Sequence, residues 1–330
     1  TKPFQPENLV KIVKKVLTDY PDDADADLYF ATQGRILEGR NNFVGARKIY
    51  EEFLKAHPKS KWADDVKSSM HEMQHPQLSV YGEEVSYAKE EDVLDISTRN
   101  VKQVTIDIYE IDLAKILLKA KKLHDPYASF TDTYEYFKNL KGLKKYCKSK
   151  VQSVGYTTKD KGDYRHVSGR KKLPELPVGA YVVHVQGSKV ETAMLLIRTD
   201  LIIVGKSVKD SLEYLVTEAW TGKPAANVEL TIKETYYDYT KNYAYKVRIS
   251  KAVTDATGRI DYKLLKGNEI SGNSVQILGR RDKSLALTGQ QYGGYWYQGE
   301  DDTFKIFTVT DRPVYRPGDT ISFKHIVRSY

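Results

Sequence analysis

The single cysteine of the chain is the first candidate for covalent chemistry. Cys147 lies among Lys144, Lys145, Lys148 and Lys150, and nearby positive charge lowers the pKa of a thiol and favours the reactive thiolate. No His with an Asp or Asn accompanies it nearby in sequence, as a nucleophilic site would need. A structural cysteine at a helix end is therefore the favoured interpretation.

Two histidines have a spacing that metal sites use. His71 and His75 are four residues apart and could share one helix face, as zinc ligands do. Pro76 follows at once and no third ligand is evident, so surface histidines at a helix end are favoured. The sequence predicts neither a metal site nor a cofactor.

Adjacent carboxylates, such as Glu83-Glu84, Glu90-Glu91 and Asp301-Asp302, are further candidates for chemistry. Paired carboxylates can serve glycoside hydrolysis or calcium binding. Each pair lies in a polar, turn-like stretch without supporting spacing, so solvated turns are favoured. With no nucleophile–base set, metal site or phosphate loop, we predict that the chain is not an enzyme.

Positive charge is concentrated in one segment. Residues 113–172 hold 16 Lys and Arg against 5 Asp and Glu, a net charge of +11, whereas the whole chain carries +8. Interleaved aromatic residues could stack on bases, which would suit a nucleic-acid surface. The favoured alternative is that the rings form the buried stripe of two helices and the lysines form their solvated face, so no nucleic-acid partner is expected.

Two smaller groups are candidates for binding a partner. The basic segment offers Lys121, Lys122, Lys144 and Lys145. The aromatic run at 292–297 offers Tyr295, Trp296 and Tyr297, either as a carbohydrate platform or as packing against a neighbouring domain. Packing is modestly favoured.

The elements that would position these residues begin with helices. Apolar residues recur at helical spacing over residues 6–73, which predicts helices ending near Tyr20 and then covering about 26–38, 44–56 and 61–73. Small residues such as Gly34 and Ala46, with Tyr50, Phe53 and Pro58, resemble a tetratricopeptide-type hairpin. Residues 1–74 are therefore expected to form a helical, tetratricopeptide-like head.

The periodicity then changes from 3.6 to 2, which predicts antiparallel strands. Residues 75–200 are expected to form a first sandwich, with a helical insertion at about 113–150. A second sandwich is expected at 201–305, and 306–330 would supply the first strands of a third, incomplete one. The expected strands of the second are 201–204, 212–218, 228–234, 243–250, 260–264 and 275–279. The fold class is thus mainly β, with a helical head and tandem Ig-like sandwiches.

One motif near the end of the chain is specific. Residues 310–324 read TDRPVYRPGDTISFK, in which two prolines fix φ and remove backbone donors, and Pro317-Gly318 marks a tight turn. A strand, a bend and a second strand are expected. The residues that carry the motif are Thr310, Asp311, Arg312, Pro313, Tyr315, Arg316, Pro317 and Gly318.

This string resembles the entry to a macroglobulin domain in the alpha-2-macroglobulins, complement relatives and bacterial homologues. Further stretches resemble the same family at 97–112, 176–185, 221–228 and 254–259. The resemblance implies a bacterial alpha-2-macroglobulin-like protein, of which this chain would be the N-terminal piece. It further implies a trap in which proteases cut a bait segment and are then captured, in many members by a Cys-x-Glu-Gln thioester.

The chain departs from that pattern, because Lys148-Ser149-Lys150 follow Cys147 and no bait segment is recognisable. We therefore expect a non-enzymatic scaffold portion of a protease-trapping or defence protein. Its partners would be proteases, through the full-length protein, and downstream macroglobulin domains of the same chain. The alternative is an envelope adhesin, or a glycan- or protein-binding module, built from helical repeats and Ig-like sandwiches.

The resemblance also bears on location. Apolar runs stay well short of the roughly 18 residues that a membrane helix needs. We expect a secreted or bacterial cell-envelope protein, periplasmic or lipoprotein-anchored, whose contact with a membrane would come only through an anchor outside this chain.

Overall fold

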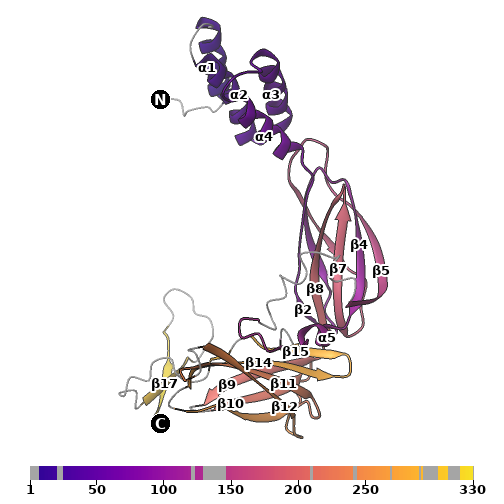
Figure 1. Ribbon diagram of the computed structural model, residues 1–330, viewed down its shortest axis with the longest axis vertical. Helices are drawn as coiled ribbons and strands as arrows, with labels where there is room; N and C mark the ends of the chain where they lie inside the picture. Colours follow the sequence, from indigo (N-terminus) through magenta and orange to yellow (C-terminus); the bar gives the residue numbers. More distant parts are fainter. Residues whose placement is uncertain are drawn as a thin grey trace.

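The computed structural model describes residues 7–20, 25–119, 123–128, 146–208, 211–240, 244–267, 270–289, 291–292, 304–310 and 320–329. A helical head lies at one end of an elongated molecule, a first β-sandwich follows it, and a second sandwich lies at the other end (Figure 1). The predicted fold class, mainly β with a helical head, is confirmed.

The head consists of four helices whose bounds lie close to the predicted ones: α1 (Glu7–Asp19), α2 (Ala26–Gly39), α3 (Phe43–Ala56) and α4 (Ala63–Gln74). Ala31, Ala46, Tyr50 and Phe53 form its core, because the apolar stripes of α2 and α3 face each other. Gly34 is needed here, since a Cβ at this position would lie 2.1 Å from Tyr50 Cε1.

The first sandwich has a three-stranded sheet in the order β1-β3-β6 and a five-stranded sheet in the order β2-β8-β7-β4-β5. Among the described strands, β2 pairs in parallel with β8 and the other pairings are antiparallel. Leu94 and Ile96 of one sheet face Ile106, Ile108 and Val183 of the other. The strands are β1 (Gln77–Tyr81), β2 (Val85–Tyr87), β3 (Val93–Arg99), β4 (Gln103–Ile111), β5 (Cys147–Thr157), β6 (Val167–Lys172), β7 (Gly179–Gly187) and β8 (Val190–Thr199).

The second sandwich packs the sheet β13-β10-β9 against β12-β11-β14-β15, and β16 also pairs with β14. Leu212 and Val216 of the smaller sheet meet Leu230, Ile232 and Ile277 of the larger one. The strands are β9 (Leu201–Val208), β10 (Ser211–Glu218), β11 (Glu229–Asp238), β12 (Ala244–Val253), β13 (Arg259–Lys263), β14 (Ile270–Arg281), β15 (Ser284–Leu287) and β16 (Gln291–Tyr292).

A separate two-stranded ribbon follows, made of β17 (Phe304–Thr310) and β18 (Phe323–Ser329). Ile306, Phe307, Phe323 and Val327 each expose half of their surface or more. An isolated two-stranded ribbon is only marginally stable in water.

The predicted helical insertion at about 113–150 begins with a helix as expected but ends earlier than predicted. The described helix, α5 (Leu113–Leu117), has five residues, and strand β5 already begins at Cys147. Cys147 therefore starts a strand and does not sit at a helix end. Residues 129–145, which include the second expected helix, lie outside the described residues. Strand β5 escaped prediction because its side chains are mostly exposed and show no apolar alternation.

Candidate functional site at the junction between the sandwiches

The residues with candidate chemistry do not assemble into a reactive site in the described parts of the chain. The rings of His71 and His75 stack with their centroids 5.5 Å apart. No group of three or more His, Cys, Asp or Glu that could hold a metal ion occurs within the described ranges. Among the same residues, no helix is both long enough and apolar enough to cross a membrane.

Most of the residues singled out for partner binding or as the family motif lie outside the described residues. These are Lys121, Lys122, Lys144, Lys145, Tyr295, Trp296, Tyr297, Asp311, Arg312, Pro313, Tyr315, Arg316, Pro317 and Gly318. Thr310 is the last residue of β17, and its backbone pairs with Phe323 of β18. The structure thus leaves their roles as predictions.

Half of the basic residues that the structure describes in the basic segment are paired with acidic residues. Five of its basic side chains form ion pairs with carboxylates, which are Lys148–Glu110, Lys150–Asp107, Arg165–Asp163, Arg170–Asp95 and Lys172–Glu91. A solvated, paired face accounts for the charge of β5 and β6 more simply than a nucleic-acid surface does.

The most elaborate arrangement of polar groups lies where the two sandwiches meet. Strand β8 ends at Thr199 and strand β9 begins at Leu201, so Asp200 is the entire linker. The Thr199 hydroxyl accepts a hydrogen bond from the Leu201 amide at 3.0 Å, and the Asp200 carbonyl accepts one from the Ala219 amide at 2.8 Å. Both bonds fix the backbone on either side of the linker.

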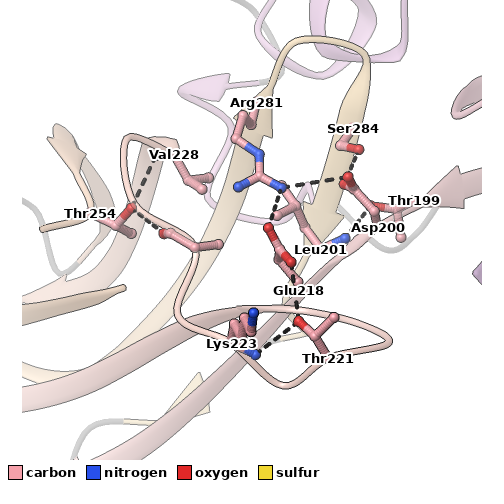
Figure 2. A network of polar contacts seen from close by, with 11 residues as sticks. Thr199, Asp200, Leu201, Glu218, Thr221, Lys223, Val228, Thr254, Arg281 and Ser284 are labelled. Carbon is pink, nitrogen blue, oxygen red and sulfur yellow. Dashed lines mark hydrogen bonds and ion pairs between the residues drawn. The ribbon is translucent and has the colours of Figure 1, made fainter. Parts of the chain in front are cut away.

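The side chain of Asp200 is also held. Figure 2 shows the guanidinium of Arg281, from β14, directed between the carboxylates of Asp200 and Glu218. Its Nη2 lies 3.5 Å from Asp200 and 3.7 Å from Glu218, and the hydroxyl of Ser284, from β15, donates to Asp200. The β14–β15 hairpin of the second sandwich therefore clamps the linker.

Two turns extend this network, and both belong to stretches that resembled macroglobulin sequence. The Thr221 hydroxyl donates to Glu218 and accepts from the Lys223 amide, each at 3.1 Å. The buried hydroxyl of Thr254 donates to the Ala225 carbonyl at 2.7 Å and accepts from the Val228 amide at 3.0 Å (Figure 2). These side chains stabilise the loops beside the clamp.

An apolar cluster lies beside the polar network and contains residues of both sandwiches. Helix α5, Val182 of β7 and Leu195 of β8 pack with Leu278 of β14 and Leu285 of β15. Each of these four named side chains is at most 6% exposed. Figure 1 shows α5 next to the β14–β15 hairpin at this junction. Apolar burial, which is non-directional, thus joins the sandwiches, and the polar clamp holds the linker residue against the second sandwich.

A buried ion pair lies on the first-sandwich side of the junction. Arg198, the residue before Thr199, is 1% exposed and pairs with Asp92, whose side chain is 4% exposed. Its guanidinium also donates to the carbonyls of Glu90 and Ala88, at 3.2 and 2.9 Å. The pair therefore ties the end of β8 to the segment before β3.

Sequence reasoning missed this junction. Its polar residues are dispersed, and no spacing rule joins Asp92 to Arg198 or Asp200 to Arg281. The available signals were the very short interval between Thr199 and Leu201 and the apolar residues on both faces of β14. An outward-facing apolar residue in a strand suggests cover by another element.

A helical head and two closely joined β-sandwiches define the chain as a modular, mainly β protein. A search against protein-family models gave no match. The chain is 29% identical over 125 residues to an alpha-2-macroglobulin homolog of Deinococcus radiodurans, a match that covers 37% of this chain and 12% of that protein. It is 23% identical over 156 residues to the alpha-2-macroglobulin of Ralstonia nicotianae, covering 47% and 9%. The chain therefore spans about a tenth of the length of these curated relatives.

Among solved structures, the chain is similar to a fragment of Escherichia coli alpha-2-macroglobulin spanning domains MG0-NIE-MG1, with 16% identity, a TM-score of 0.43 and 64% of each chain covered. A shorter fragment, NIE-MG1, has a TM-score of 0.38, with 15% identity over 66% of this chain and 97% of that one. These matches agree with the resemblance that the sequence motifs carry: part of the chain is similar in sequence to bacterial alpha-2-macroglobulins.

Proposed function

We propose that this chain is a non-enzymatic scaffold portion of an alpha-2-macroglobulin-like protein that traps proteases. The observation that carries the proposal is the clamped junction, in which one linker residue, a polar network and a shared apolar cluster join two sandwiches. Such a junction suits a framework that holds other domains at set positions. It needs no reactive group of its own.

The partners follow from the same proposal. Proteases would meet the full-length protein, and further macroglobulin domains of the same polypeptide would pack beyond the second sandwich. The exposed apolar residues of the β17–β18 ribbon support this packing, because a third sandwich would cover them. By the same reasoning, the chain alone would capture no protease.

We also propose that the protein acts in the bacterial cell envelope, in the periplasm or anchored as a lipoprotein. The support is the bacterial origin of the two curated relatives. Cell fractionation of the native host with an antibody against this chain tests the location. Recovery in the cytoplasmic fraction would contradict it.

A protease assay tests the function. The full-length protein is incubated with a broad-specificity serine protease, whose activity is then measured on a large protein and on a small peptide. A trap lowers activity on the large substrate and spares the small one, because it encloses the enzyme without blocking the catalytic site. This chain alone should change neither activity. The proposal fails if the full-length protein spares both substrates, or if the chain inhibits by itself.

A further inference from the structure

Lys233 occupies an unusual place for a lysine. It lies in the middle of β11, next to Ile232, which points into the core of the second sandwich, so Lys233 points to the opposite face. On that face it is nonetheless 2% exposed. Lysine is almost never fully buried unless its ammonium group is paired.

The partners of Lys233 come from the first sandwich. Its Nζ donates to the carbonyl of Asp125 at 2.6 Å and to the carbonyl of Ala128. Both carbonyls belong to residues 123–128, which follow α5 and which we name the strap. Within the strap, the Asp125 carboxylate accepts from the Tyr127 amide at 2.9 Å, so the strap forms a compact turn over the ammonium group.

Two further contacts hold the strap at its ends. Leu123 packs against the apolar cluster of the junction. The ring of Tyr127 meets the ring of Tyr245, from β12, edge to face with centroids 5.8 Å apart. The strap therefore reaches from the junction cluster across the outer face of β11 and β12.

Burial of an ammonium group is unfavourable unless hydrogen bonds to strong acceptors replace its hydration. The two strap carbonyls supply that replacement for Lys233. Burial also lowers the pKa of the Lys233 ammonium. An apolar side chain of similar length would avoid the desolvation cost but would offer the strap nothing to bind.

We infer that residues 123–128 are a strap, latched on Lys233, that fixes the angle between the two sandwiches. This goes beyond the proposed function, since it concerns contacts within the chain and holds whether or not the full-length protein traps proteases. The clamp at Asp200 and the strap lie at different places on the second sandwich. Two separated attachments restrict rotation, whereas one attachment permits it.

The test compares Lys233→Met with Lys251→Met in the whole chain. Lys251 is a matched control, because it lies on the same face of the same sheet but is exposed. Hydrogen–deuterium exchange of the peptide that contains 123–128 reports release of the strap. Spin labels at Gln152→Cys and Asp261→Cys, in a Cys147→Ala parent that keeps the unfolding temperature of the wild type, report the distance between the sandwiches.

Lys233→Met is expected to accelerate exchange in the strap about tenfold or more, since hydrogen bonds from a charged donor are lost. It is also expected to broaden the distance distribution, whereas Lys251→Met leaves both unchanged. Unchanged exchange would overturn the latch, and faster exchange with an unchanged distribution would overturn its control of the angle. If Lys233→Met does not fold, Tyr127→Ala replaces it, because this substitution removes the contact between the strap and Tyr245. Unchanged hydrogen–deuterium exchange of the strap, or an unchanged distance distribution, would then count against the proposal in the same way.

Discussion

The guanidinium of Arg281 lies 3.5 Å from the carboxylate of Asp200, the residue that alone links the two sandwiches. The side chains are 27% and 43% exposed, so the ion pair is worth less than a buried one would be. Arg281 contacts Glu218 as well, and it therefore connects the linker, β10 and β14.

We expect Arg281→Ala to lower the free energy of unfolding by about 1 kcal/mol, because the guanidinium serves two carboxylates. Arg280→Ala is the matched control on the same strand, since Arg280 forms an exposed pair with Glu229 at 2.9 Å and should cost less than about 0.5 kcal/mol. Urea unfolding of both variants measures the difference. Equal costs would mean that Asp200 is not clamped.

Leu278 and Ile277 are adjacent but serve different cores. Leu278 packs in the junction cluster, and Ile277 packs inside the second sandwich. Substitution of either by Ala should cost roughly 2–5 kcal/mol, the usual range for a buried Leu or Ile.

Calorimetry should distinguish the two substitutions. Leu278→Ala is expected to separate the unfolding of the two sandwiches into distinct transitions, whereas Ile277→Ala leaves the junction cluster intact and lowers the temperature of one shared transition without splitting it. If the two variants give the same profile, the junction cluster does not couple the sandwiches.

Removal of one partner of the Arg198–Asp92 pair should strongly lower the free energy of unfolding of the protein. Asp92→Ala leaves a guanidinium that is 1% exposed without its counter-charge, at a cost of about 3–5 kcal/mol. The exposed pair of Arg170 and Asp95 is the control, and Asp95→Ala should cost less than about 1 kcal/mol. Chemical denaturation decides: a cost for Asp92→Ala as small as that of the control is incompatible with a buried pair.

The helical head should respond to acid through Asp27. A hydrogen bond from the Ser60 side chain holds the pKa of Asp27 below its ordinary value of 3.8. A lowered pKa in the folded state contributes stability that is present above pH 3.8 and is lost as the pH falls through the folded pKa. Ser60→Ala should therefore cost about 1 kcal/mol or more at neutral pH, and the difference from the wild type should shrink in strong acid to the contribution of the hydrogen bond that Ser60 accepts from the Trp62 amide.

Helical circular dichroism during an acid titration checks this pH dependence. Asp64→Asn is the control, because the side chain of Asp64 is 94% exposed. A constant difference between wild type and Ser60→Ala at all pH values would show that the hydrogen bond is not linked to the ionisation of Asp27.

Most of the regular structure could be predicted because its periodicity is set by burial on one face. The stripes of α2 and α3 and the alternation at the start of β4 are of this kind. Strands β5 and β6 could not, since Lys148 and Lys150, or Arg170 and Lys172, carry no sign of a buried face. These two segments form strands because their backbones pair with neighbouring strands, and the local sequence pattern does not indicate that pairing.

The junction escaped prediction for a different physical reason. Leu278 and Ile277 are both apolar, and their sequence pattern does not indicate that they are buried in two different cores. The sequence alone suggests that Lys233 is solvent-exposed, and only the structure shows its ammonium group hydrogen-bonded to the strap. Such residues are defined by contacts between distant segments, and only the tertiary structure supplies these.

The most direct test of the scaffold proposal is protease capture by the full-length protein with and without the double substitution Leu278→Ala and Arg281→Ala. The rate at which a broad-specificity protease cuts the protein and the fraction of protease retained are measured together. We predict an unchanged cutting rate and a several-fold smaller retained fraction, because the framework would no longer hold the other domains in position. Equal capture by both proteins would contradict a scaffold role for the junction.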